Sequence, residues 1–148
     1  MSDPDFQSIS IYTDGGARGN PGPAASAYHA RTFPGQRVLS ENAVFLGHST
    51  NNIAEYNAFL LALRWLSASD FPHISTVNFF SDSLLVVSQL NHRYKIKDAK
   101  LKELYSQVQG LLADPRLLRF HVMFQHIPRS QNAQADRLVN QVLDKSSP

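Results

Sequence analysis

The stretch from Ile9 to Pro23 constrains the fold more than any other part of this 148-residue chain. The alternating residues at 9–13 predict a strand with one buried face, and we expect that strand to cover about 7–13. From Gly15 to Pro23, glycines and prolines are so dense that we expect a turn and neither a helix nor a strand. Asp14 would then lie at the far end of the strand. It could bind a metal ion there, or it could simply open an Asp-Gly turn.

Length and composition indicate one globular domain over residues 1–148, with an ordered core at about 7–144, because 43% of the residues are hydrophobic. Cysteine is absent, which excludes disulfides and thiolate sites. The net charge of +2 permits a nucleic-acid partner without arguing for one. The acidic N-terminus and the lack of an apolar run of bilayer length lead us to expect a soluble, cytoplasmic protein with no membrane partner. We also expect a monomer.

The remaining periodicity predicts an α/β fold. Strands at 24–32 and 38–47 would complete an antiparallel meander with the first strand. We expect a buried helix at 53–67, with Asn52 as its N-cap and Glu55 as the capping-box partner. The expected elements after it are a strand at 74–80, a helix at 84–90, a helix from the N-cap Asp98 to 112, a strand at 117–125 and a helix at 130–143. We expect fraying at 1–6 and a loose tail at 145–148. This order predicts a five-stranded mixed sheet with helices on both faces.

Four of the 12 acidic residues have unusual positions: Asp14 and Asp82 follow predicted strands, Glu55 begins the buried helix, and Asp136 lies inside the last helix. Each has an ordinary alternative role, namely a turn for Asp14, an N-cap for Asp82, a capping box for Glu55 and simple solvation for Asp136. If the four converge, their charges repel, and cations are needed to hold them together. Mg²⁺ or Mn²⁺ suits such oxygen ligands, and two ions some ~4 Å apart can clamp a phosphodiester.

Four sequence motifs contain or flank these acidic residues: TDGGARGNPGP at 13–23, TNNIAEYNAFLLAL at 50–63, SDS at 81–83 and NAQADRL at 132–138. Together they resemble the ribonuclease H family, of the small type 1 (ribonuclease HI) class. The resemblance implies a ribonuclease H-like fold with Asp14, Glu55, Asp82 and Asp136 as metal ligands. It also implies an endonuclease that cleaves the RNA strand of RNA–DNA hybrids with two Mg²⁺ or Mn²⁺ ions. The products would carry 5′-phosphate and 3′-hydroxyl ends.

The resemblance further implies the residues that contact substrate. Asn20, Asn51 and Asn52 match family positions that touch the hybrid, where amides can bond 2′-hydroxyls across the wide minor groove. Thr50 matches a position that grips a DNA phosphate. Arg18 could pair with phosphate or could be an ordinary solvated side chain.

Three features differ from the family pattern. The loop before the last helix is short and offers only His126 and Arg129 in place of the family's loop histidine. We favour Arg129 as a cation that helps product release, and we interpret His126 as structural. Leu84 stands where many members have a substrate-contacting glutamine. Many members also have a basic protrusion between the middle helices. The insertion that would form it is absent here, although half of the residues at 93–102 are basic. That segment is either a solvated face or a short phosphate-tracking patch, which would make binding salt-sensitive. Because the patch is reduced, we expect modest affinity.

Three functions remain open at the level of the sequence. The first is hydrolysis of the hybrid by in-line attack of water, with no covalent protein intermediate. The second is a non-catalytic binder of hybrid or RNA, which four clustered carboxylates disfavour. The third is a nuclease or transferase of the same fold acting on double-stranded RNA or DNA. The asparagines at 20, 51 and 52 favour the hybrid as the partner, with double-stranded RNA as a further candidate.

Overall fold

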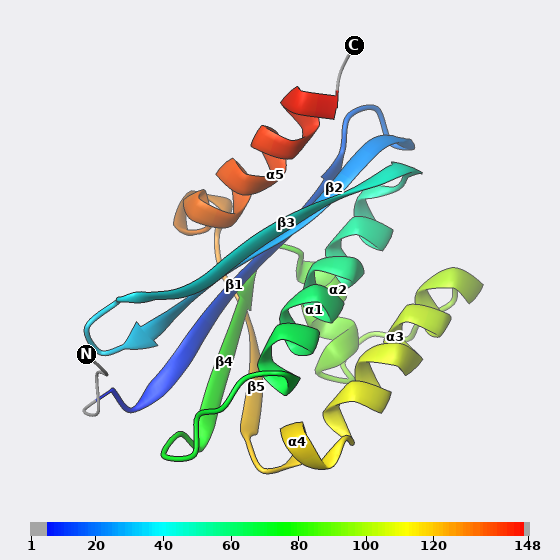
Figure 1. The fold of residues 1–148 in the computed structure, drawn as a ribbon. Coiled ribbons are helices and arrows are strands. Elements are labelled where there is room, and N and C mark those ends of the chain that lie inside the picture. Colours follow the sequence, from blue (N-terminus) through cyan, green and yellow to red (C-terminus); the bar gives the residue numbers. More distant parts are fainter. Residues whose placement is uncertain (1–5, 147–148) are drawn as a thin grey trace.

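A computed structural model describes residues 6–146, which form one five-stranded sheet with helices on both faces (Figure 1). The strands are β1 (Ser8–Ala17), β2 (Gly22–Phe33), β3 (Val38–Ser49), β4 (Thr76–Ser81) and β5 (His121–His126). The helices are α1 (Asn51–Ser67), α2 (Leu84–Leu90), α3 (Ala99–Leu112), α4 (Pro115–Leu118), the 3₁₀ turn η1 (Arg129–Gln131) and α5 (Ala133–Ser146). The strand order is β3-β2-β1-β4-β5. The predicted fold class is confirmed.

The sheet combines an antiparallel meander with two parallel strands. β1 pairs antiparallel with β2, and β2 pairs antiparallel with β3. β4 pairs parallel with both β1 and β5. In Figure 1, α1 to α4 lie on one side of the sheet and α5 lies on the other. None of the helices within residues 6–146 has both the length and the apolar character needed to cross a bilayer.

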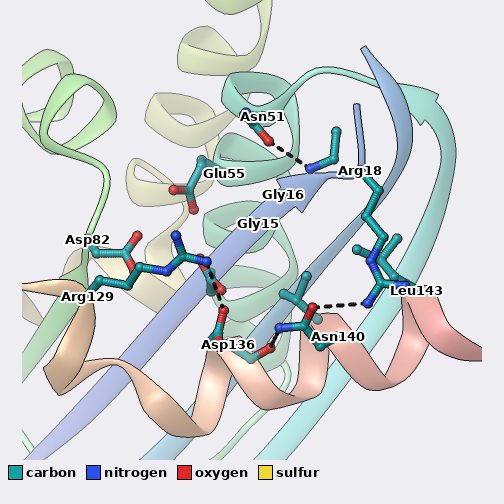
Figure 2. Close-up of a pocket in the computed structure, with 13 residues that line it drawn as sticks. Gly15, Gly16, Arg18, Asn51, Glu55, Asp82, Arg129, Asp136, Asn140 and Leu143 are labelled. Carbon is teal, nitrogen blue, oxygen red and sulfur yellow. Dashed lines mark hydrogen bonds and ion pairs between the residues drawn. The ribbon is translucent and has the colours of Figure 1, made fainter. Parts of the chain in front are cut away.

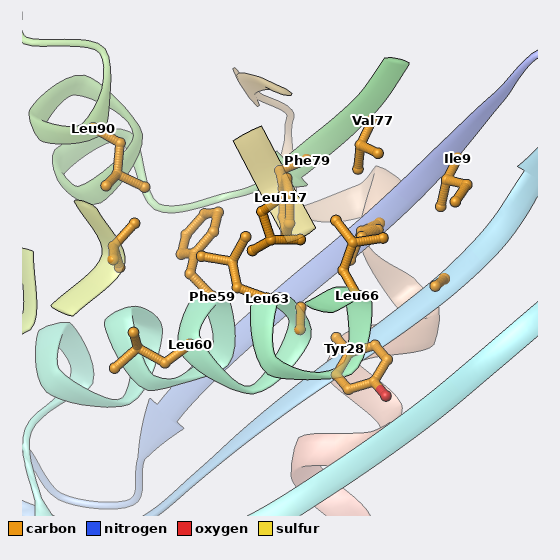
Figure 3. Packing of buried hydrophobic residues seen from close by; sticks show 14 of the residues in the cluster. Ile9, Tyr28, Phe59, Leu60, Leu63, Leu66, Val77, Phe79, Leu90 and Leu117 are labelled. Atoms are coloured by element: carbon orange, nitrogen blue, oxygen red, sulfur yellow. The ribbon is translucent and has the colours of Figure 1, made fainter. Parts of the chain in front are cut away.

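The main core lies between the sheet and α1 (Figure 3). Alternation along β1 sends Ile9 and Ile11 to this side, where both are fully buried. They pack in one cluster with Phe59 and Leu63 of α1 and Phe79 of β4. The α1 helix is apolar on nearly every side because strands and helices cover it, which agrees with the buried helix predicted from the sequence.

The prediction for the glycine-rich stretch is wrong in one respect. β1 continues through Asp14, Gly15 and Gly16 to Ala17, and these residues pair with Ala27 to Ala24 of β2. The turn is therefore confined to 18–21. Glycine is a poor strand residue, but antiparallel pairing with β2 outweighs that preference here.

Other predicted boundaries also shift. Thr50, and not Asn52, is the N-cap of α1, because its Oγ1 accepts a hydrogen bond from the Ile53 N–H at 3.3 Å. Residues 115–118 form the short helix α4, so β5 begins at His121 and not at 117. Asp114 caps α4 with a proline at the first helical position, which favours a helix start.

The ends differ from the predictions as well. Phe6 is buried and not frayed, and α5 includes residues 145 and 146 of the predicted tail. Residues 1–5 and 147–148, which complete the two predicted loose ends, lie outside the described part of the chain.

Candidate active site

Three carboxylates from separate elements meet at one edge of the sheet. Asp14 lies in β1, Glu55 in the second turn of α1, and Asp82 directly after β4. One oxygen from each lies within 4.8 Å of the other two. Asp14 and Glu55 are buried and Asp82 is half-buried. The neighbouring parallel strands β1 and β4 hold Asp14 and Asp82 close together.

Gly15 sets how closely β1 approaches α1. A Cβ atom at this position would lie 2.2 Å from the Ala54 carbonyl carbon and 2.5 Å from the Glu55 nitrogen. Only a residue without a side chain lets the helix backbone touch the strand here. The Ser26 hydroxyl reinforces the contact by donating to the Ala54 carbonyl oxygen at 2.6 Å. The glycine after Asp14 therefore brings Glu55 next to that carboxylate.

The fourth acidic residue, Asp136, lines the same cavity of about 510 Å³. It lies in the first turn of α5, where the helix dipole favours a carboxylate, and not in the helix interior as predicted. Arg129 of η1 lies over the acidic cluster, with Nη2 3.7 Å from Asp136 Oδ1 (Figure 2). The Arg129 side chain is 82% exposed, so solvent screens this pair.

The ordinary roles considered for these acids are not the ones observed. Asp14 lies inside β1, where it pairs with Ala27 of β2, and it does not open a turn. Thr50 caps α1, so Glu55 closes no capping box there. Ser83, and not Asp82, caps α2 by accepting from the Val86 N–H at 3.3 Å.

Crowding and burial perturb these carboxyl groups. Burial is the main cause that raises the pKa of Asp14 from 3.8 to about 8, and the charges of Asp82 and Asp136 act in the same direction. Burial likewise raises the pKa of Glu55 well above its ordinary value, with the charge of Asp14 adding to it. Burial also raises the pKa of Asp82. A cluster that resists ionisation in this way gains most from a bound cation.

The donor set fits a hard divalent cation. All four side chains offer carboxylate oxygens, which Mg²⁺ and Mn²⁺ prefer. Glu55 Oε1 is buried and has no hydrogen-bond partner within the described residues. A buried carboxylate oxygen without a partner is costly, and a metal ion would satisfy it. Asp14, Glu55, Asp82 and Asp136 are thus candidate ligands.

Asn132 is a site residue that the sequence reasoning missed. It is fully buried, and its Nδ2 donates to the Thr13 carbonyl oxygen at 2.8 Å, next to Asp14. Its backbone carbonyl oxygen accepts from the Asp136 N–H at 3.1 Å. Burial raises the pKa of Asp82, and hydrogen bonding from Asn132 opposes that rise. The residue joins β1 to the start of α5. Its position at the head of the NAQADRL segment was the available signal.

The predicted substrate contacts divide between two cavities on either side of the α1 N-terminus. Arg18 and Asn51 line the acidic cavity. Asn20, Thr50 and Asn52 line a neighbouring cavity of about 320 Å³. That cavity is also lined by Lys100 and Asp98 at the start of α3.

Most of these residues already have partners within the protein. The Asn20 Oδ1 accepts from the Asn51 N–H at 3.0 Å, and the Asn51 Oδ1 accepts from the Ala17 N–H at 2.8 Å. These bonds fasten the β1–β2 turn to α1. Arg18 is bound by Asp144 at 2.7 Å and by the Asn140 Oδ1 at 3.1 Å, both on α5. It is therefore not the simply solvated side chain considered from the sequence.

His126 is the last residue of β5 and is exposed. Its charge lowers the pKa of Asp82, although burial, which raises that pKa, is the larger effect. It therefore lies near the acidic cluster but, like Arg129, on its rim.

Comparison with known proteins places this geometry in a family. A family model described as "Reverse transcriptase-like" matches residues 12–142. The structure of LC11-RNase H1 in complex with an RNA/DNA hybrid has a TM-score of 0.84 and 39% identity, covering 93% of this chain and 98% of that one. A ribonuclease H of Chlorobium phaeovibrioides is 30% identical over 93% of this chain and 96% of its own length. The chain belongs to the ribonuclease H family.

Some members of the ribonuclease H family are much longer. The bifunctional protein Rv2228c of Mycobacterium tuberculosis is 35% identical over 141 residues, which cover 94% of this chain and 36% of that protein. The chain thus spans about a third of the length of the first curated relatives it matches.

Proposed function

We propose that this chain is an endoribonuclease that hydrolyses the RNA strand of RNA–DNA hybrids with two Mg²⁺ or Mn²⁺ ions. The products would be 5′-phosphate and 3′-hydroxyl ends. The observation that carries the proposal is the meeting of Asp14, Glu55 and Asp82 within 4.8 Å, with Asp136 lining the same cavity. The LC11-RNase H1 complex, a 39% identical neighbour with bound RNA/DNA hybrid, supports the choice of substrate.

In this proposal the four carboxylates hold the ions, which when bound activate water and stabilise the leaving oxygen of the RNA phosphate. Asp14 and Glu55 supply the buried ligands, whose positions the β1–α1 contact fixes. Asp82 and Asp136 lie nearer the cavity mouth and complete the set. The protein contributes rigid positions for these oxygens, and water attacks in line without a covalent protein intermediate.

The substrate would lie across the N-terminus of α1. In this proposal Asn20, Asn51 and Asn52, which line the two cavities there, contact the minor groove, where 2′-hydroxyls distinguish a hybrid from B-DNA. The cavity that contains Thr50 and Lys100 would receive a phosphate of the DNA strand, with the lysine supplying the charge. Arg18 would reach a phosphate only by leaving Asp144, so we assign it a weaker contribution.

Arg129 takes two roles in this proposal. Without metal its guanidinium offsets the charge of Asp136 and lowers the pKa of Asp14, although burial dominates that pKa. When ions and substrate occupy the cavity, its exposed side chain can turn to the phosphate and help the product leave. Replacement by alanine is expected to slow product release and to spare the chemical step.

The test is a cleavage assay with end-labelled RNA–DNA hybrid, double-stranded RNA and double-stranded DNA, each with Mg²⁺, Mn²⁺ or chelator. Metal-dependent cuts confined to the RNA strand of the hybrid support the proposal, and analysis of the ends identifies the 5′-phosphate. Tight binding of the hybrid without cleavage in either metal would instead favour a non-catalytic binder. Equal cleavage of double-stranded RNA would broaden the substrate class.

A further inference from the structure

A second polar cavity lies on the α5 side of the sheet, away from the carboxylates. Its floor is a row of side chains on four strands: Tyr12 on β1, Arg31 on β2, Phe80 on β4 and Gln125 on β5. Tyr12 is paired with Phe80, and Phe80 with Gln125, in the strand register. In Figure 1, α5 runs along the β2–β3 half of the sheet and leaves the β4–β5 half of this face without a helix.

The wall of the cavity is the segment that joins β5 to α5. It contributes Ile127, Ser130, Gln131, Ala133 and Gln134. The volume of this open cavity is about 510 Å³. That size is within the range of roughly 300–1,000 Å³ that is typical of small-molecule sites.

The floor combines aromatic rings with a cation. The rings of Tyr12 and Phe80 stack with centroids 5.0 Å apart, and the Arg31 guanidinium lies 4.5 Å from the Tyr12 centroid. Within residues 6–146, Arg31 has no ion pair, and none of the residues that line the cavity is acidic. The five guanidinium N–H donors of Arg31 are therefore available to an anion.

The glutamines supply unused donors and acceptors. No hydrogen bond within the described residues involves the side chain of Gln125, Gln131 or Gln134, and none is made by the Ser130 hydroxyl. A primary amide donates and accepts side by side, which matches the polar edge of a nucleobase. Aromatic surface beside it suits the base plane, and the arginine suits a phosphate.

We propose that this cavity binds a nucleotide, either free or as an unpaired nucleotide of a strand, with its phosphate on Arg31 and its base against Phe80 and the glutamines. The cavity is concave, polar and cationic, so it fits a small anionic ligand better than the apolar surface of a protein partner. The site shares no lining residue with the acidic cavity, and the inference does not depend on the proposed nuclease activity.

The experiment is a titration of the ¹⁵N-labelled chain, in chelator, with each of the four 5′-ribonucleoside monophosphates. Ribose 5-phosphate and an eight-nucleotide single-stranded DNA are titrated in parallel. We expect saturable shifts of the Gln125 and Gln134 side-chain amides, with dissociation constants in the millimolar range or below. Ribose 5-phosphate should bind at least about fivefold more weakly because it lacks the base. Shifts with the oligonucleotide as well would identify a strand as a source of the ligand.

Two variants make the assignment specific. Arg31→Ala should weaken nucleotide binding by about tenfold, because a charged hydrogen bond to phosphate is lost. Arg37→Ala, at an exposed arginine after β2, changes the net charge equally and should stay within about twofold of the parent. Absence of shifts in this cavity with all four nucleotides would overturn the inference. So would equal binding of ribose 5-phosphate, or equal losses in the two variants. Since chelator removes the metal, failure here leaves the cleavage assay unaffected.

Discussion

At the scale of single residues, Gly15 is a position that tolerates substitution poorly, because there is no room for a side chain. A Cβ would meet the backbone of Ala54 at 2.2 Å, and backbone atoms cannot move aside cheaply. We expect Gly15→Ala to lower the free energy of unfolding by about 3 kcal/mol or more, as measured by urea denaturation.

Gly110 in α3 provides the matched control for that substitution. Its added Cβ would meet nothing within 4 Å, and it lies on an exposed helix position. Gly110→Ala should stabilise the protein by about 0.5–1 kcal/mol, since alanine is the better helix former. Similar effects of both substitutions would contradict the close contact of β1 with α1.

Asp14 gives a prediction about pH. Its folded pKa of about 8 lies above the ordinary 3.8, mainly through burial. Between these values the folded state keeps a proton that the unfolded state releases, so metal-free stability falls as pH rises through this window. Asp14→Asn removes this cost and should stabilise the chelated protein by on the order of 2 kcal/mol at pH 7.

Urea denaturation in chelator at pH 5 and pH 8 measures this effect. The parent should lose stability between the two values more steeply than Asp14→Asn does, and saturating Mg²⁺ should restore much of the loss. Identical pH slopes for the two proteins would show that Asp14 ionises normally.

Sequence reasoning succeeded for residues whose chemistry is unusual for their position. Each of Asp14, Glu55 and Asp82 has an ordinary alternative role, but their positions taken together, within motifs that resemble the ribonuclease H family, allowed them to be grouped before their contact was known. Asn132 could not be found in this way. The role of Asn132 comes from its hydrogen bond to the Thr13 carbonyl, and Thr13 is far away in the sequence, so no local pattern reveals the contact.

At the scale of elements, the α1 N-terminus is where prediction and structure disagree most usefully. Asn52 has a suitable residue type for a cap, but only Thr50 has the extended backbone and the bond to the Ile53 N–H. Thr50→Ala should therefore cost about 1 kcal/mol of stability. Asn52→Ala should stay within about 0.5 kcal/mol. Chemical denaturation of the two variants checks this. A larger loss of stability for Asn52→Ala than for Thr50→Ala would show that Asn52 is the N-cap.

The start of α5 yields a second prediction at this scale. Asn132→Ala should cost about 1–3 kcal/mol because the buried Thr13 carbonyl loses its donor. It should also lower kcat, since Asp136 follows on the same turn. Asn91→Ala is the control, because Asn91 Nδ2 makes a comparable bond to the Phe124 carbonyl at 2.9 Å outside the site.

The control separates positioning from stability. Asn91→Ala should lose similar stability and keep the parent kcat for hybrid cleavage. If both variants keep the parent kcat, Asn132 has only a structural role.

Element boundaries were predictable where local signals were strong and isolated. Asp98 caps α3 and Ser83 precedes α2, so these helices begin where the sequence indicates. The end of β1 was not predictable, because Gly15 and Gly16 read as breakers. Their strand conformation depends on pairing with β2, a tertiary contact that local propensity does not contain.

At the scale of the whole molecule, the hydrophobic core holds the strands and the helix that position the acidic residues. The large core between the sheet and α1 fixes β1, β4 and α1, which hold Asp14 and Glu55 and lead directly into Asp82. Arg129 of η1 and Asp136 of α5 are more exposed and complete the lining of the cavity. The order of elements was enough to predict a five-stranded mixed sheet with helices on both faces, because a meander followed by crossovers leaves few possible topologies.

The measurement that tests the central claim is single-turnover cleavage of an end-labelled RNA–DNA hybrid in saturating Mg²⁺. The parent is compared with Asp14→Asn, Glu55→Gln, Asp82→Asn and Asp136→Asn, after circular dichroism has shown that each variant is folded. We predict a fall in rate of at least about 100-fold for each substitution, because each removes a charged ligand from a shared metal site. A folded Asp14→Asn variant that cleaves the hybrid at the parent rate would contradict the claim.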